Sequence, residues 1–186
     1  MKSLYALAFS LLASGAAAQD IGLKMPEIGQ GSYATYKVGK ATYTHVFAGK
    51  SGKYFVYDVV PGDDPEGMEG RSRYFRDGNG QTVKWVTAGG DTVTFTPHNC
   101  QRTVGACEFT EEGVSEGEPY KTRMIRTNTP TSKGFNFEQV GFGPDGKEYR
   151  LMGGSVELDD YGLMRRATVR NAEAKTKFKL VKAVIR

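Results

Sequence analysis

Apolar and polar residues alternate along most of the chain after about residue 32. In the segment KYFVYDVV, the residues Phe55, Tyr57 and Val59 occupy every second position, and DTVTFT (91–96) shows the same alternation. A repeat of two places successive side chains on opposite faces of an extended chain. The pattern therefore predicts β-strands that turn one face toward a core.

Eleven such segments follow one another at intervals of roughly 8 to 14 residues. Turn-forming sequences separate them, such as GNG at 78–80 and GPDGK at 143–147, and no amphipathic helix interrupts the series. We expect an all-β fold: an antiparallel up-and-down meander that closes into a barrel, lipocalin-like in shape only, or a β-sandwich if it does not close. The predicted strands are residues 41–48, 53–60, 71–77, 81–87, 91–96, 107–112, 119–127, 134–142, 147–158, 163–170 and 176–186.

The first eighteen residues have the pattern of a Sec-type signal peptide. Lys2 precedes the apolar run LYALAFSLLASG, and AAA at 16–18 supplies small residues for cleavage after Ala18. We expect a periplasmic or secreted protein with an irregular segment at 19–32 and a single β domain at 33–186. No cysteine follows the apolar run to carry a lipid, and no second apolar stretch approaches transmembrane length.

A transmembrane barrel is disfavoured by charges within the predicted strand 119–127. Lys121 and Arg123 lie on one face of this strand and Arg126 on the other, whereas a lipid-facing side must be apolar. We therefore expect a soluble, exported protein that does not span the membrane.

The only two cysteines, Cys100 and Cys107, are separated by QRTVGA. They lie where one predicted strand has ended and the next begins, and disulfides persist in exported proteins. We predict a disulfide across this hairpin. A zinc or copper site with His98 is the alternative, but a closed zinc site needs four ligands at short spacings. We therefore expect no metal and no cofactor.

Candidate catalytic chemistry is sparse. His45 lies on an alternating strand, but no GxSxG or SxxK motif accompanies it, so we assign no catalytic residue. The acidic stretches 58–69 and 108–118 are interpreted as solvated loops, with calcium binding as the alternative. Paired carboxylates for glycoside hydrolysis stay open, because their separation is three-dimensional.

Positive charge is concentrated at the end of the chain. Residues 162–186 carry eight Lys and Arg against Glu173, a net charge of +7, while residues 19–186 as a whole carry +3. If the last two strands pair, one face of the sheet becomes basic and attracts anionic partners such as polysaccharide, lipid headgroups or an acidic protein. Lysines that protect a strand edge are the alternative, and nucleic acid is not expected outside the cytoplasm. The predicted patch is Arg166, Arg170, Lys175, Lys177 and Lys179.

Ten tyrosines, ten phenylalanines and one tryptophan supply the inward positions of the predicted barrel. Such side chains either fill a small barrel or line a ligand cavity. The candidate ligand-binding residues are His45, Tyr57, Trp85, Phe95, Phe137 and Tyr149.

Three functions are compatible with these observations. The first is a non-enzymatic exported protein that binds a small or lipidic ligand or an anionic component of the cell envelope. The second is a periplasmic protein–protein interaction module, an inhibitor or an assembly accessory, that uses the loop 98–108. The third is a hydrolase that uses His45, His98 or the acidic loops.

Overall fold

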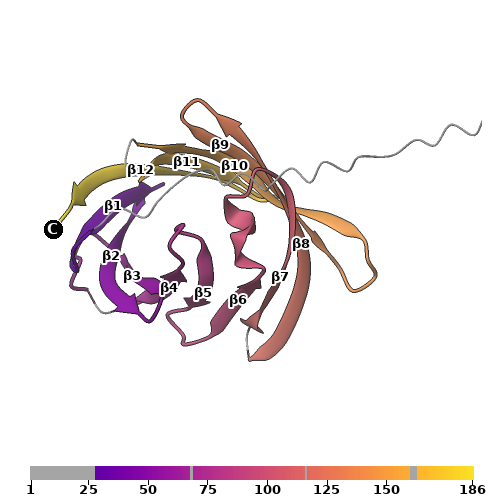
Figure 1. The fold of residues 1–186 in the computed structure, drawn as a ribbon, viewed down its shortest axis with the longest axis horizontal. Coiled ribbons are helices and arrows are strands. Elements are labelled where there is room, and N and C mark those ends of the chain that lie inside the picture. Colours follow the sequence, from indigo (N-terminus) through magenta and orange to yellow (C-terminus); the bar gives the residue numbers. More distant parts are fainter. Residues whose placement is uncertain (1–27, 68, 116, 160–162) are drawn as a thin grey trace, which may run out of the picture.

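The computed structural model describes residues 28–67, 69–115, 117–159 and 163–186. The predicted signal peptide, its cleavage point after Ala18 and residues 19–27 lie outside the described residues. Within the described part of the chain, twelve antiparallel strands form one closed barrel (Figure 1).

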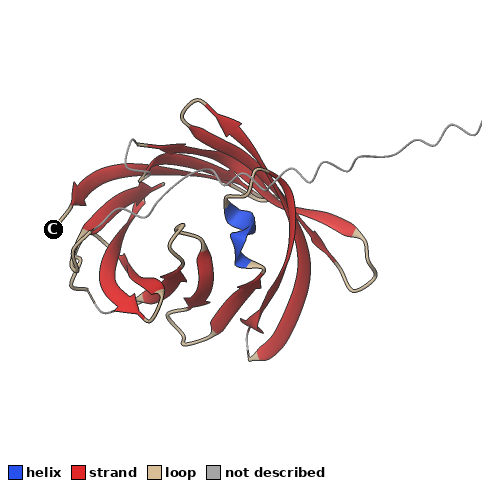
Figure 2. Cartoon of the chain, in the orientation of Figure 1, coloured by secondary structure: helices blue, strands red, loops and turns tan. Residues whose placement is uncertain are grey.

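Each strand pairs with its neighbours in the sequence, and the last strand pairs with the first. Figure 2 shows strands throughout and one short 3-10 helix, η1 (His98–Gln101). The prediction of an all-β barrel is confirmed, and its closure excludes the β-sandwich. The strands are β1 (Tyr33–Val38), β2 (Ala41–Ser51), β3 (Tyr54–Pro61), β4 (Ser72–Arg76), β5 (Thr82–Val86), β6 (Thr92–Thr96), β7 (Gly105–Ser115), β8 (Glu118–Thr131), β9 (Gly134–Phe142), β10 (Glu148–Leu158), β11 (Met164–Arg170) and β12 (Lys175–Val184).

No helix among these residues is long and apolar enough to cross a membrane. The predicted turn at residues 78–80 is confirmed between β4 and β5. Gly80 adopts a φ of 73° there, a conformation that glycine reaches without steric cost. The Asp77 carboxylate accepts hydrogen bonds from the backbone N–H groups of Asn79 and Gln81, both at 2.9 Å, and fixes the turn.

Strand β1 closes the barrel and is not among the eleven predicted strands. Tyr36 faces Leu180 of β12, and Ala34 faces His45 of β2. β1 has six residues, and one of its two partners, β12, lies about 140 residues away in the sequence. Because β1 bridges β2 and β12, every strand of the barrel has two neighbours and no strand edge stays unpaired.

Aromatic side chains form a row across the inside of β2 to β5. The pairs Phe47–Tyr57, Tyr57–Tyr74 and Tyr74–Trp85 lie directly opposite each other on neighbouring strands. The rings of Tyr74 and Trp85 are stacked, with centroids 5.5 Å apart. Cross-strand aromatic contacts of this kind add to the stability that burial alone provides.

The predicted disulfide is confirmed: Cys100 of η1 is bonded to Cys107 of β7. Cys100 is 1% exposed and packs with Phe109 and Met124. The bridge therefore holds η1 against the inner wall, and Figure 1 shows η1 within the ring of strands. The disulfide therefore does not only close a hairpin at the surface; it also fixes the segment between β6 and β7 inside the barrel.

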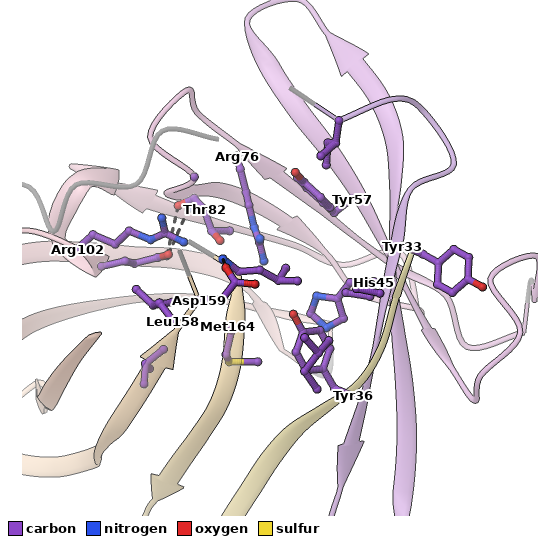
Figure 3. Close-up of a pocket in the computed structure, with 18 of the residues that line it drawn as sticks. Tyr33, Tyr36, His45, Tyr57, Arg76, Thr82, Arg102, Leu158, Asp159 and Met164 are labelled. Carbon is purple, nitrogen blue, oxygen red and sulfur yellow. Dashed lines mark hydrogen bonds between the residues drawn. The ribbon is translucent and has the colours of Figure 1, made fainter. Parts of the chain in front are cut away.

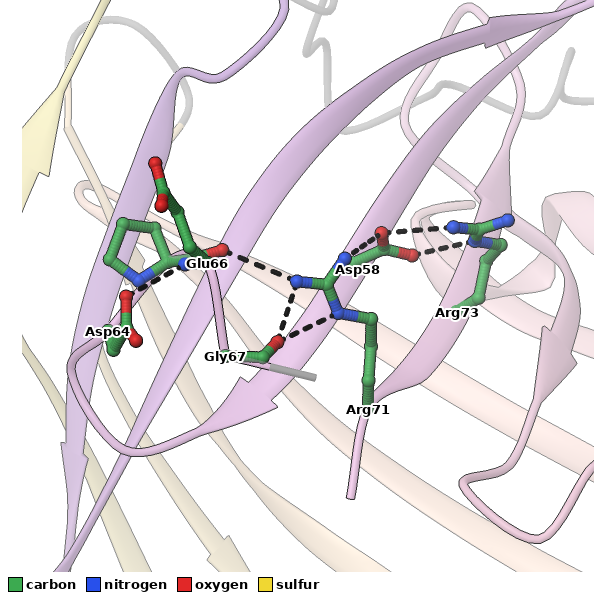
Figure 4. Close-up of polar contacts among 7 residues, drawn as sticks. Asp58, Asp64, Glu66, Gly67, Arg71 and Arg73 are labelled. Atoms are coloured by element: carbon green, nitrogen blue, oxygen red, sulfur yellow. Dashed lines mark hydrogen bonds and ion pairs between the residues drawn. The ribbon is translucent and has the colours of Figure 1, made fainter. Parts of the chain in front are cut away.

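Asp58, which belongs to a predicted solvated acidic stretch, is instead buried on the outside of β3. Its carboxylate accepts hydrogen bonds from Arg71 at 3.0 Å and from Arg73 at 2.6 and 3.0 Å (Figure 4). Arg71 also donates to the carbonyl oxygen of Gly67 at 2.6 Å, so it ties the loop 62–71 to the barrel wall. The interpretation as a solvated loop is wrong for Asp58, because paired arginines compensate for its burial.

We expect Asp58→Asn to lower the free energy of unfolding by about 2 kcal/mol, because it leaves two arginines without their carboxylate. The loss is smaller than for a fully buried pair, since the Arg73 side chain is 48% exposed. Urea denaturation measures it. Asp63→Asn, on the exposed part of the same loop, is the matched control and should change stability by less than about 0.5 kcal/mol. Equal effects of the two substitutions would contradict the assigned role of Asp58.

Candidate functional site

A cavity of about 530 Å³ occupies the barrel interior at the end that carries η1. Its wall is largely apolar and includes Phe95, Phe109, Phe135, Val156 and Leu180. Both the volume and the lining lie within the range of pockets that hold small organic ligands. The barrel is therefore hollow at this end, although aromatic residues are numerous.

Polar side chains enter the cavity from four consecutive strands. Tyr36 of β1, His45 of β2, Tyr57 of β3 and Arg76 of β4 all line it (Figure 3). They lie at inward positions of the alternating pattern, and the cross-strand register brings them to one side of the interior. The cavity thus has one polar side on an otherwise apolar wall.

His45 is neutral at physiological pH. Burial, and secondarily the positive charge of Arg76, lowers the pKa of its imidazole to about 3. The ring contacts Tyr36 edge to face, with centroids 5.1 Å apart. A histidine with this pKa is a poor general base near neutrality, but its ring offers both a donor and an acceptor to a bound molecule.

The two tyrosine hydroxyls of this side are protonated. Burial raises the pKa of Tyr36 to about 12, and it also raises the pKa of Tyr57, in each case against the opposing effect of Arg76. The hydroxyl oxygen of Tyr57 is buried and has no hydrogen-bond partner among the described residues. Tyr57 therefore has an unused donor and acceptor beside the cavity.

Arg126 of β8 lines the opposite wall and is held by its neighbours. Its Nε donates to Asn128 at 2.9 Å, its Nη1 donates to Gln139 at 3.4 Å, and its guanidinium lies 4.1 Å from the ring centroid of Phe137. Burial lowers the pKa of Arg126 to about 10, so the group is still charged at neutral pH.

The segment between the two disulfide-bonded cysteines, Cys100 and Cys107, forms part of the cavity wall through Gln101 and Arg102. The side-chain amide of Gln101 accepts from the backbone N–H of Thr82 at 3.2 Å and donates to its carbonyl at 3.4 Å, as a neighbouring strand would. Asn128 donates to the carbonyl oxygens of Cys100 at 2.9 Å and of Thr103 at 2.8 Å. These bonds satisfy backbone groups that would otherwise be buried without partners.

His98 does not face the cysteines in a metal site. Its Nε2 lies 3.1 Å from the carboxylate of Asp77, in the turn between β4 and β5. The described residues contain no group of three or more His, Cys, Asp and Glu side chains placed to hold a metal ion.

Residues 108–115 of the acidic segment lie along β7, and two of their carboxylates pair with cations of the next strand. Glu108 pairs with Arg123 at 2.7 Å, and Glu112 pairs with Lys121. Antiparallel pairing of β7 with β8 places these opposite charges side by side. Two of these carboxylates therefore already have cationic partners, and Glu111 accepts a hydrogen bond from the Tyr120 hydroxyl, which does not favour the calcium alternative.

The structure brings together only some of the predicted ligand-binding residues. His45, Tyr57 and Phe95 line one cavity. Trp85 lies inside the barrel against Tyr74, and Phe137 is buried beneath Arg126. Tyr149, at the start of β10, is 43% exposed and does not line this cavity.

The predicted basic patch lies on the outside of the barrel, away from the cavity. Arg166 faces Lys179, and Arg170 faces Lys175, across the β11–β12 pair. All of these side chains and that of Lys177 are exposed. None of them has a carboxylate within ion-pair distance in the described part of the chain, although Glu157 lies opposite Arg166 on β10.

Several lining residues were not identified from the sequence. Arg76 lies two positions after Tyr74, and Arg126 lies two positions after Met124, so both arginines share a face with an inward residue. A charged residue at an inward-facing position of the alternating pattern was the signal that could have identified them. The charge of Arg126 served above only as evidence against a lipid-facing strand. The polar and charged lining residues that were not among the sequence-based candidates include Tyr36, Arg76, Arg102, Arg126, Gln139 and Asp159.

Comparison of the chain with models of known protein families, with curated protein sequences and with solved structures found no match. Function must therefore be inferred from the chemistry of the site itself.

The low pKa of His45 predicts a specific loss of stability in mild acid. The unfolded chain binds a proton at His45 below its ordinary pKa of about 6.5, whereas the folded protein does not until about pH 3. Stability contributed by the neutral ring is thus complete above pH 6.5 and falls by about 1.4 kcal/mol per pH unit below it.

We expect His45→Gln to remove this component. Urea denaturation at pH 7, 6 and 5 compares the slope of unfolding free energy against pH in the two proteins, so a constant offset caused by the substitution does not matter. Identical slopes would show that His45 titrates normally in the folded state.

Proposed function

We propose that this protein binds a small, largely apolar ligand inside its barrel. The observation that carries the proposal is the cavity of about 530 Å³, with apolar walls and polar groups gathered on one side. Pockets of this size and composition bury most of the surface of a small ligand, while a few polar contacts set its orientation.

Unpartnered polar atoms beside the cavity support the proposal. Tyr57 Oη and Arg76 Nε are buried and have no hydrogen-bond partner among the described residues, and both residues line the cavity. They belong to the neighbouring strands β3 and β4. Buried polar groups are nearly always paired, and unpaired ones are costly, so a cluster of them is explained by a ligand that supplies the partners.

The hydrolase alternative is less well supported. His45 has a pKa of about 3, far from the value suited to proton transfer at neutral pH. His98 is directed to Asp77 rather than to the cavity residues.

The alternative of a protein–protein interaction module is weakened, because part of the loop 98–108 that would contact a partner is buried. η1 is folded against the inner wall, and Cys100 is almost fully buried. Much of the loop 98–108 is therefore turned toward the interior and not toward a partner.

A second candidate function is binding of an anionic envelope component by the outer basic face, which we define as Arg166, Arg170, Lys175, Lys177 and Lys179. Pairing of β11 with β12 puts these five side chains on one exposed surface. Lys37 of β1, opposite Lys179, extends it. A depression lined by Arg165, Arg166, Lys179 and Lys182 adjoins it.

The explanation that these lysines protect a strand edge does not suit a closed barrel. Both β11 and β12 have two hydrogen-bonded neighbours, so neither is open to aggregation through its backbone. The surplus of positive charge is better explained by attraction to an anionic surface.

Filling the cavity tests the first proposal. We expect the wild-type protein to increase the fluorescence of N-phenyl-1-naphthylamine, an apolar probe. Ala34→Phe and Met164→Trp, which add volume at two lining positions, should weaken probe binding about tenfold or more, in proportion to the apolar contact area that they remove from the probe.

Ala106→Phe, at an exposed position of β7, is the matched control and should bind the probe as wild type does. Circular dichroism identifies any variant that fails to fold. If the folded variants all bind the probe equally, the cavity is not the binding site; if wild type does not bind it, the proposal loses its first support.

The outer basic face is tested with phosphatidylglycerol vesicles. Lys175→Gln, Lys177→Gln and Lys179→Gln together should weaken vesicle binding about 100-fold at low salt, from about 1 kcal/mol per lysine. The control combines Lys50→Gln, Lys53→Gln and Lys133→Gln, which remove the same charge from exposed positions elsewhere. Co-sedimentation measures both, and equal losses would indicate a general effect of net charge.

A further inference from the structure

Arg76 places a positive charge in the cavity, and no carboxylate of the described residues forms an ion pair with it. Its side chain extends from the end of β4 into the interior (Figure 3), and its Cζ lies 4.9 Å from the ring centroid of Tyr57. Its Nε is buried and has no hydrogen-bond partner among the described residues. No carboxylate in the described part of the chain lies within 4.0 Å of its guanidinium.

The charges that line the cavity do not balance. Arg76, Arg102 and Arg126 contribute three positive charges, and His45 is neutral. Among the described lining residues, the one carboxylate is that of Asp159. The described lining residues thus carry three positive charges against one negative charge, a net charge of +2.

The other inward carboxylate near this region is already engaged. Glu111 lies opposite Phe95 on the β6–β7 pair, and it accepts a hydrogen bond from the Tyr120 hydroxyl at 2.8 Å. Asp159 is oriented by its turn, where one carboxylate oxygen accepts the backbone N–H of Leu163 at 2.8 Å. Neither carboxylate lies within ion-pair distance, 4.0 Å, of the Arg76 guanidinium.

The three lining arginines differ in what surrounds them. Arg126 is fixed by Asn128 and Gln139 and covers the ring of Phe137. Arg102 donates to the carbonyl oxygen of Asn79 at 3.2 Å. Arg76 contacts the face of Tyr57 and has no hydrogen-bond acceptor among the described residues, so its N–H donors are the ones left to bind a ligand. A planar guanidinium matches a carboxylate through two parallel hydrogen bonds.

We propose that the ligand is an amphiphile with a carboxylate group, which Arg76 binds with the Tyr57 hydroxyl as an additional donor, while its apolar part lies against Phe95, Phe109 and Leu180. This inference rests on the proposed function, since it specifies the ligand of the same cavity. A carboxylate supplies the missing counter-ion for Arg76 and reduces the net charge of the lining to +1.

Decanoate and decanol test the inference, because they share an apolar chain and differ in the head group. Displacement of N-phenyl-1-naphthylamine at pH 7.5 measures both. We expect wild-type protein to bind decanoate at least tenfold more tightly than decanol. Arg76→Met should weaken decanoate binding about 10- to 100-fold, as expected for loss of a charge-assisted hydrogen-bond pair, and should leave decanol binding within about threefold.

Lys133→Met, at an exposed position between β8 and β9, is the matched control, because it removes one positive charge outside both the cavity and the outer basic face. It should retain the preference for decanoate. Arg76→Lys, which keeps the charge but not the paired geometry, should have an intermediate affinity.

The outcomes separate this inference from the proposed function. If wild type binds the probe, decanoate and decanol with no preference for decanoate, the cavity binds ligands but the carboxylate assignment is wrong. If nothing binds, the proposed function fails as well. Tighter binding of decyl phosphate than of decanoate would also overturn the carboxylate assignment. The wild-type preference decides the matter even if Arg76→Met does not fold.

Discussion

The pairing of β1 with β12 is the constraint on which the rest of the molecule depends. It joins the two ends of the meander and turns a twelve-stranded sheet into a barrel with an inside and an outside. Once the sheet is closed, alternate residues of each strand face either the interior or the surface. The pair Tyr36–Leu180 joins the first strand to the last, and the pair Ala34–His45 places β1 beside the polar side of the cavity.

Buried charge is treated differently on the two faces of the barrel wall. On the outer face, the buried Asp58 of β3 pairs with Arg71 of the loop 62–71 and with Arg73 of β4. Inside, Arg126 is surrounded by amide groups and an aromatic ring, whereas Arg76 has no acceptor in the described part of the chain. A buried charge without an opposite charge is costly, so a bound anion would stabilise Arg76 in this interior.

The disulfide contributes to the cavity by positioning a loop. Cys100 and Cys107 hold η1 against the inner wall, while Asn128 and Gln101 satisfy its backbone and that of Thr82. The loop can therefore lie inside a barrel without leaving polar groups unpaired. It narrows one end of the interior and helps to shape the cavity that the strands alone would leave more open.

The sequence by itself predicted eleven of the twelve strands and the disulfide, because alternation, turn residues and cysteine spacing are local signals. It predicted a basic face only on the condition that the last two strands pair. Local pattern also indicated that His45, Tyr57 and Phe95 face inward, but it did not distinguish a filled interior from a hollow one. Only the tertiary structure decided that β1 closes the barrel, that Asp58 meets Arg71 and Arg73, and that Arg76 faces the cavity with no carboxylate partner among the described residues. Each of these depends on contacts between strands whose register, and not their sequence pattern, sets the distances.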